Sequence, residues 1–137
     1  MNEFHLTVVT PDGEKFNGYA TSLLVKTDSG DVEILAKHAD YFASLGIGKA
    51  RIDANGARKF ASSQGGFISV SKNEVMLVAT TFEFADEIDI KRAEKAKENA
   101  EQIIANANDD KLITMAKAKL ARALNRINVS ELSGKYK

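Results

Sequence analysis

The residues best suited to chemistry in this chain are an aspartate and three arginines in its C-terminal part. Asp89 stands three residues before Arg92, and Arg122 stands four before Arg126, so each pair would lie on one flank of a helix. Guanidinium groups bind phosphate oxygens through paired hydrogen bonds, and a carboxylate accepts hydrogen bonds from a base or a ribose. If the two pairs meet, they would bind a phosphate chain with an attached polar group.

The surrounding pattern predicts the elements that would bring these residues together. From Asp89 onward, small apolar residues recur at helical steps, at Ala93, Ala96, Ala100, Ile103 and Ala107. Residues 106–110 are typical of a loop, in which Asp109 or Asp110 would cap a second helix. The apolar face of that helix would consist of Leu112, Ala116, Leu120, Ala123, Leu124 and Ile127. Two matched stripes joined by a short loop predict an antiparallel helical hairpin.

Residues equally distant from the loop of such a hairpin lie side by side. Arg92 would therefore face Arg122 and Arg126 at the open end of the hairpin, next to the rest of the protein. The alternative is that these arginines form only surface ion pairs, for which the nearby acids are Asp86, Glu87 and Glu94. Spacing alone leaves both interpretations open.

The composition of the chain changes at Asp86, and this change predicts its domain organisation. Eight of the nine glycines and the only proline precede it, whereas alanine is abundant after it. Alternation at Phe4, Leu6 and Val8, with turn signals such as Pro11-Asp12-Gly13 and Ala54-Asn55-Gly56, indicates eight or more short strands. We therefore expect a mainly β plus α protein: an N-terminal β-sandwich of short antiparallel strands at residues 1–84, then the two-helix hairpin at residues 85–137.

Composition also excludes several classes of function. The 19 basic and 19 acidic residues balance, which argues against nucleic acid and anionic membranes as partners. The chain has no cysteine, and its two histidines have no partner at metal-ligand spacing. No apolar run reaches the length of a membrane span, and no signal peptide is recognisable, so neither direct membrane insertion nor secretion is expected.

No motif indicates catalysis, since the sequence has no nucleophile elbow, phosphate-binding glycine loop or zinc spacing. We expect no catalytic residue, no metal site and no required cofactor. The second predicted helix is basic, because no acid occurs between Lys111 and Ile127. It would be either a solvated face or a surface for an acidic protein partner, presented by Lys117, Lys119, Arg122 and Arg126.

Several segments, in order along the chain, resemble the epsilon subunit of bacterial F-type ATP synthases. Val9-Thr10-Pro11-Asp12-Gly13 is similar to the opening of that family, and Glu33-Ile34-Leu35-Ala36-Lys37-His38-Ala39 to its Gly-Ile-Leu-Pro-x-His-Ala segment. Gly65-Gly66-Phe67-Ile68-Ser69-Val70 resembles its Gly-Gly-Phe-x-x-Val strand. Ile88-Asp89-Ile90-Lys91-Arg92-Ala93 and the arginines of the last helix complete the resemblance, which extends over nearly the whole chain.

The resemblance implies a non-catalytic subunit of the central stalk, or rotor, that couples ion flow to ATP synthesis. Its sandwich would bind the gamma subunit. It would also contact the membrane rotor ring, the c-ring, through loops that contain Asp28, Gly30, Lys37 and His38. Its hairpin would extend toward the catalytic alpha and beta subunits and inhibit ATP hydrolysis. The protein would lie peripherally on the cytoplasmic side of the bacterial membrane, as part of the complex.

In some members of that family the folded hairpin binds ATP as a regulatory ligand. Carried over to this chain, the implied residues are Glu83, Ile88, Asp89, Arg92, Ala93, Arg122 and Arg126. Ala36 and Asp40 depart from the prolines usual in the family, and Asn99 replaces a basic residue of some ATP-binding members. The alternatives are a stand-alone nucleotide-sensing adapter and, less favoured because no site is visible, an enzyme built on a small sandwich.

Overall fold

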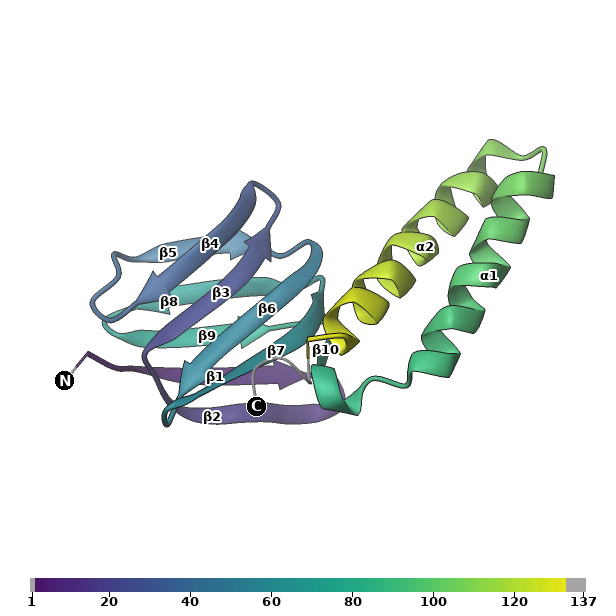
Figure 1. Ribbon diagram of the computed structural model, residues 1–137. Helices are drawn as coiled ribbons and strands as arrows, with labels where there is room; N and C mark the ends of the chain where they lie inside the picture. Colours follow the sequence, from purple (N-terminus) through teal and green to yellow (C-terminus); the bar gives the residue numbers. More distant parts are fainter. Residues whose placement is uncertain (1, 133–137) are drawn as a thin grey trace.

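The computed structural model describes residues 2–132, in which strands come first and helices last (Figure 1). Within these residues ten strands form two five-stranded sheets. The first sheet has the order β2 (Gly13–Ala20), β1 (Phe4–Thr10), β9 (Glu74–Val78), β8 (Phe67–Ser71) and β5 (Tyr41–Ser44). The second has the order β10 (Thr81–Phe84), β7 (Ala57–Gln64), β6 (Ile47–Ala54), β3 (Ser22–Thr27) and β4 (Gly30–Leu35).

The predicted sandwich followed by a helical hairpin is confirmed, with three differences of detail. β5 and β10 were not predicted, because four residues place only two side chains on each face and show no readable alternation. β1 pairs with β9 in parallel, although the other strand pairs of the described residues are antiparallel. This parallel pair needs no crossover helix because the intervening chain returns through the second sheet.

The core of the sandwich lies between the two sheets. The alternation predicted at Phe4, Leu6 and Val8 is observed, since all three are at most 1% exposed. Gly66 turns the chain from β7 into β8 with a φ of +90°, and a Cβ there would lie 1.8 Å from the carbonyl oxygen of Val78. A larger residue at this turn would therefore displace the end of β9, the central strand of the first sheet.

Charged side chains form a continuous network across the outer face of the second sheet. Arg51 donates to Ser22 at 2.9 Å and to Glu33, and Arg58 donates twice to Asp53 at 2.9 and 3.0 Å. Hydrogen bonds from Ser22 and then Arg51 lower the pKa of Glu33, and those from Arg58 lower the pKa of Asp53. Each of these carboxylates therefore becomes protonated at a lower pH in the native protein than an isolated side chain would.

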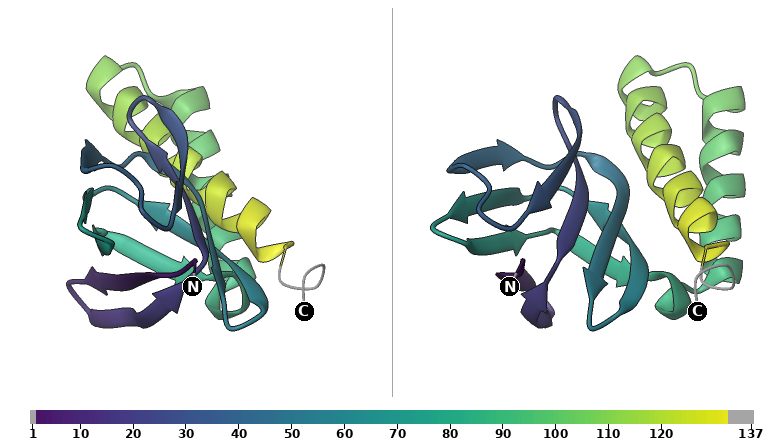
Figure 2. Two further views of the ribbon diagram at one scale, coloured as in Figure 1. Left: turned by 90° about the vertical axis from the view of Figure 1, so that its left-hand side faces the viewer. Right: turned by 60° about the vertical axis from the view of Figure 1, so that its left-hand side comes forward.

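The hairpin consists of α1 (Ile90–Asn106) and α2 (Asp110–Ser130), preceded by the short 3₁₀ helix η1 (Ala85–Glu87). Asp109 caps α2 by accepting the Lys111 N–H at 2.8 Å, as one of the two predicted caps. The helices run side by side in opposite directions, and the loop between them is the part of the hairpin farthest from the sandwich (Figure 2). The C-terminal end of α2 lies against β6 and β7.

We predict that a fragment of residues 1–84 folds without the hairpin. All members of the main apolar core, from Phe4 to Phe82, belong to this fragment, so its burial does not depend on the helices. Thermal unfolding followed by circular dichroism should give one cooperative transition, at a lower temperature than for the full chain because Phe60 loses its cover. Noncooperative unfolding of the fragment would show that the sandwich and the hairpin are one folding unit.

Candidate functional site

The hairpin is attached to the sandwich through a second, smaller apolar cluster. Phe60 on β7 packs with Ala85, Ile88 and Val129, and Leu132 lies against this cluster. Val129 is 1% exposed, so this side chain in the last turn of α2 is covered as fully as the sandwich core. Burial of this size stabilises the attachment by roughly 1.5–3 kcal/mol per large side chain. We call this cluster, together with the polar contacts described next, the docking contact.

Asn125 provides the central polar part of the docking contact. Its amide nitrogen donates to the backbone carbonyl of Gly48 and to the hydroxyl of Ser62, both at 2.9 Å. Gly48 has no side chain, and a Cβ there would lie 2.6 Å from the Cβ of Lys26. A side chain at position 48 would therefore displace Lys26 on the neighbouring strand β3.

Arg126 forms the charged part of the docking contact with Glu83 on β10. Its Nε lies 2.8 Å from Oε1, and its Nη2 donates to Oε2 at 3.0 Å. The two side chains are only 22% and 29% exposed, so the pair is screened less than a surface ion pair. The Glu83 carboxylate thereby neutralises one of the three arginines.

The alternative of surface ion pairs with the neighbouring acids is not observed in the described residues. Glu87 lies 3.9 Å from Lys15 and accepts the backbone N–H of Phe84 at 3.2 Å, while Asp86 and Glu94 form no ion pair. Arg92 and Arg122 likewise form no ion pair with any described residue. Their charges are available to a ligand or a partner.

A cleft of about 460 Å³ opens between the hairpin and the end of β7. α1 contributes Ala96, Asn99, Ala100 and Ile103, α2 contributes Lys119, Arg122, Ala123 and Arg126, and β7 contributes Gln64. Small-molecule sites usually have volumes of about 300–1,000 Å³ and combine an apolar lining with a few placed polar groups. The cleft has this composition, with its cations gathered on α2.

The structure brings together some of the predicted nucleotide residues and separates others. Arg122 and Arg126 line the cleft, and Glu83 is paired with Arg126. The remaining residues, Ile88, Asp89, Arg92 and Ala93, are not among its lining residues. Asp89 caps α1 by accepting the backbone N–H of Arg92 at 3.1 Å, Ile88 is in the docking contact, and Ala93 is buried.

Gln64 lines the cleft and was missed from the sequence. No periodic pattern marks it, because its position depends on which strand lies under α2. Asn99 was singled out only as a substitution within the family, and the structure places it in the lining of the same cleft.

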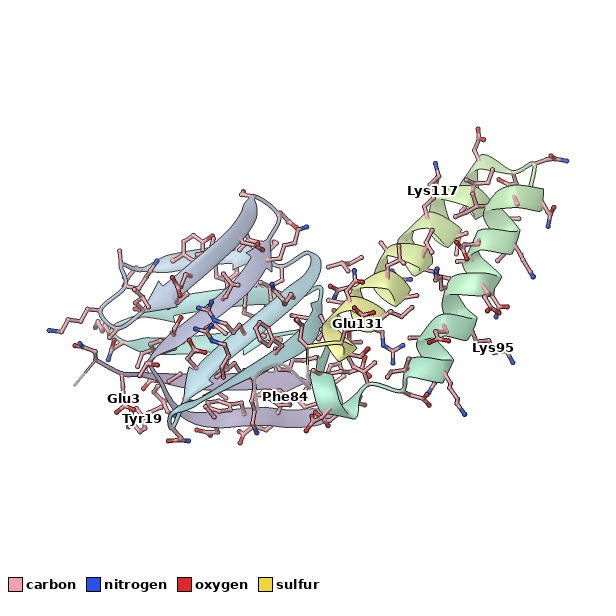
Figure 3. All side chains as sticks on the ribbon, in the orientation of Figure 1. Glu3, Tyr19, Phe84, Lys95, Lys117 and Glu131 are labelled. Atoms are coloured by element: carbon pink, nitrogen blue, oxygen red, sulfur yellow. The ribbon has the colours of Figure 1, made fainter. Side chains whose placement is uncertain are left out.

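The four residues of the basic helix do not share one face. Lys119, Arg122 and Arg126 line the cleft, whereas Lys117 is not among its lining residues and projects from α2 on the side away from α1 (Figure 3). At about 100° per residue, Lys117 lies nearly opposite Arg126 around the helix axis. A partner that contacts Lys117 would therefore use a different side of α2.

The loops proposed for the rotor ring lie at opposite ends of β4. Asp28 lies in the turn before this strand and Gly30 is its first residue, whereas Lys37 and His38 follow its end. Six residues of strand separate the two loops by about 20 Å. The Lys37 N–H is held by the side-chain oxygen of Asn73 at 2.8 Å, and the His38 ring packs edge-on against Tyr41. The structure therefore does not unite the four residues in one patch.

Apolar side chains are exposed on the outer face of the first sheet. Phe42 is 67% exposed and stacks on Phe67 with their ring centroids 5.3 Å apart. Met76, 43% exposed, lies in the same row as Phe42, with Ser69 between them. Contiguous exposed apolar groups of this kind mark interaction surfaces.

Two absences among the described residues bear on the chemistry of the protein. Among residues 2–132, no group of three or more histidine, cysteine, aspartate or glutamate side chains could hold a metal ion. Neither helix of this part of the chain is both long enough and apolar enough to cross a lipid bilayer.

Comparisons with known proteins place the chain in a family. The family described as ATP synthase, Delta/Epsilon chain, beta-sandwich domain matches residues 3–85, and the corresponding long alpha-helix domain matches residues 86–131. The ATP synthase epsilon chain of Bacillus pumilus is 34% identical over 95% of this chain and 98% of its own length. That of Levilactobacillus brevis is 38% identical over 92% and 93%.

Solved structures of the same fold come from mitochondrial ATP synthases. A chain of the Euglena gracilis enzyme, in a structure of OSCP, F1 and c-ring, has a TM-score of 0.79 and 20% identity and covers 90% of this chain and 78% of its own. A chain of the Tetrahymena thermophila central stalk and c-ring has a TM-score of 0.61 and 16% identity, with coverages of 92% and 95%. The chain belongs to the delta/epsilon chain family of ATP synthase. The predicted resemblance is thereby confirmed.

We predict that Asn125→Ala loosens the hairpin from the sandwich without unfolding either part. Two neutral hydrogen bonds are lost, which together contribute about 1–3 kcal/mol. Because the chain has no cysteine, cysteines introduced at Asp31 and Lys117 would carry a unique pair of spin labels. The measured distance distribution should broaden for Asn125→Ala and stay narrow for Asn108→Ala in the distant hairpin loop. Equal distributions would assign docking to the apolar cluster and the Arg126–Glu83 ion pair.

Proposed function

We propose that this chain is the central-stalk, or rotor, subunit that couples ion flow to ATP synthesis and whose hairpin inhibits ATP hydrolysis. The observation that carries the proposal is the form of the attachment: one end of α2 holds the hairpin, while the loop end is free of the sandwich. A small contact of this kind can open and close. Relatives named ATP synthase epsilon chain, 34% to 38% identical over most of the chain, support it.

The gamma subunit is the proposed partner of the exposed apolar face. Phe42, Phe67 and Met76 would pack against an apolar surface of that subunit. Covering the stacked aromatic pair would remove its apolar area from water and stabilise the complex. This partner would remain bound whatever the hairpin does, because the face belongs to the first sheet and α2 contacts the second.

The c-ring is the proposed partner of one end of the sandwich. Since the turn with Asp28 and Gly30 and the loop with Lys37 and His38 lie at opposite ends of β4, a flat ring surface would contact one of them, and the other would face elsewhere in the complex. With this placement the subunit is peripheral on the cytoplasmic side of a bacterial membrane.

The catalytic alpha and beta subunits are the proposed partners of the extended hairpin. Lys117 and Lys119 are exposed on opposite sides of α2, so a hairpin inserted between acidic surfaces would present a cation to each side. Arg122 and Arg126 would join this contact after release from the cleft.

ATP is proposed as a regulatory ligand of the cleft rather than a required cofactor. Lys119 and Arg122, which form no ion pair with any described residue, would bind the phosphates, and bound nucleotide would stabilise the docked hairpin. A ligand shifts such an equilibrium only through its different affinity for the two states. Because α1, α2 and β7 all contribute to the cleft, undocking would dismantle the site.

The same cleft supports a second candidate function, a stand-alone nucleotide-sensing adapter. That protein would bind ATP but would need no exposed apolar face on the first sheet. Replacement of Phe42 and Phe67 by serine distinguishes the two functions, because loss of assembly with the gamma subunit is expected only for the stalk subunit.

We predict that deletion of residues 86–137 raises ATP hydrolysis by the assembled enzyme. The hairpin would no longer reach the catalytic subunits, whereas the sandwich would still bind the gamma subunit. Alanine at Lys117, Lys119, Arg122 and Arg126 together should produce the same increase, measured by coupled-enzyme ATPase assay. Alanine at Lys95 and Lys97 on α1, which removes two cations from the other helix, serves as a control for loss of surface charge. Unchanged hydrolysis in both test variants would contradict an inhibitory hairpin.

We predict that Arg122→Ala weakens ATP binding to the isolated chain by about tenfold to a hundredfold, because hydrogen bonds to charged groups contribute about 1.5–3 kcal/mol. Arg122 is the suitable test residue because Arg126 also holds the docking contact. Lys111→Ala, beside the hairpin loop, should bind like the parent in isothermal titration calorimetry. Equal affinities would leave the cleft cations without a nucleotide role.

A further inference from the structure

Asn73 lies in the turn between β8 and β9 and holds two other segments of the chain. Its side-chain oxygen accepts the backbone N–H of Lys37 at 2.8 Å, and its side-chain nitrogen donates to the backbone carbonyl of Glu3 at 2.7 Å. Its own carbonyl accepts the His5 N–H at 3.1 Å. Figure 1 shows the loop before β5, the β8–β9 turn and the start of β1 at the same end of the sandwich. One asparagine therefore joins three segments that are distant in the sequence.

The loop that Asn73 contacts consists of residues 36–40 and passes from β4 in the second sheet to β5 in the first. It contains neither proline nor glycine, and Lys37 has a φ of +63°, which is uncommon for a lysine. Such a conformation persists only where neighbouring groups hold it. Among the described residues, the other hydrogen bonds of the loop join residues 35–39 to one another. The Asn73 side chain therefore provides the hydrogen bond that ties this loop to a distant segment.

We propose that Asn73 is the positioning residue of this loop and fixes the conformation in which Lys37 and His38 meet the c-ring, a role that rests on the proposed contact between the c-ring and one end of the sandwich. A loop that is ordered before binding loses less conformational entropy when it meets a partner. Asparagine suits this role because it tolerates the left-handed backbone, here a φ of +64°, and because its amide both accepts and donates.

Three variants of the full-length chain separate this role from general stability. Asn73→Gly keeps a backbone that readily adopts positive φ and removes the amide. Asn73→Asp keeps an acceptor for the Lys37 N–H, but its carboxylate cannot donate to the Glu3 carbonyl. Asn55→Gly is the matched control, because Asn55-Gly56 is also a two-residue hairpin turn at positive φ. The Asn55 side chain forms no hydrogen bond with another described residue.

The first measurement is hydrogen exchange at the Lys37 amide by nuclear magnetic resonance. We expect Asn73→Gly to accelerate this exchange by about fivefold to tenfold, the factor that corresponds to loss of one neutral hydrogen bond. Asn73→Asp and Asn55→Gly should exchange at Lys37 like the parent. Unchanged exchange in Asn73→Gly, or an equal acceleration in either of the other variants, would overturn the positioning role.

The second measurement tests the contact itself in the assembled enzyme. Because the chain has no cysteine, Asp40→Cys provides a unique site in the loop for a photoreactive maleimide. We expect this label to crosslink to a c-ring subunit, with a lower yield when Asn73→Gly is added and the parental yield with Asn73→Asp or Asn55→Gly. Without any crosslink in the parent, the contact of this loop with the c-ring is wrong, whatever the exchange rates are. An equal yield with Asn73→Gly would leave the contact in place and overturn the role of Asn73.

Discussion

The packing of α2 along β7 is the contact on which the hairpin, the cleft and its charges depend. Successive turns of a helix are about 5.4 Å apart, and alternate residues of a strand are about 6.6 Å apart. Because these two spacings are similar, residues one turn apart on α2 can contact alternate residues of β7 over a short distance. At one end Phe60 packs with Val129, and at the other Gln64 shares the cleft with Arg122. Asn125 makes the hydrogen bonds between these points. An apolar, a polar and a charged layer therefore follow one another along a single contact.

This arrangement couples attachment of the hairpin to the chemistry of the cleft. Arg126 belongs to both, because it lines the cleft while its guanidinium is paired with Glu83. The ion pair fixes the position of α2 and leaves Lys119 and Arg122 as the two cations of the cleft lining that have no acidic partner among the described residues. The affinity of the cleft for a ligand therefore depends on the position of α2. By linkage, a bound ligand shifts the equilibrium between the docked and undocked positions of α2.

Local and periodic features of this structure could be predicted from the sequence, whereas features that depend on tertiary contacts could not. The number of residues between the hairpin loop and each arginine predicted that Arg122 and Arg126 lie beside the sandwich, because helix geometry is regular. The same count could not show that the Asp89 carboxylate accepts the backbone N–H of Arg92 at the start of α1. It also could not identify Gln64, whose exposure to the cleft is decided by which strand lies under α2. Strands of four residues escaped prediction for a related reason, since neighbouring strands define them.

The hydrogen bond from Asn125 to the carbonyl of Gly48 has a consequence for how this protein can diverge. A backbone carbonyl is present whatever side chain a position carries, so substitution elsewhere on the strand cannot delete the acceptor. The constraint falls instead on Gly48, where any Cβ would meet Lys26 at 2.6 Å. Over evolutionary time β6 can therefore change its other side chains without loss of this hydrogen bond, whereas the second hydrogen bond of Asn125 is lost with the hydroxyl of Ser62.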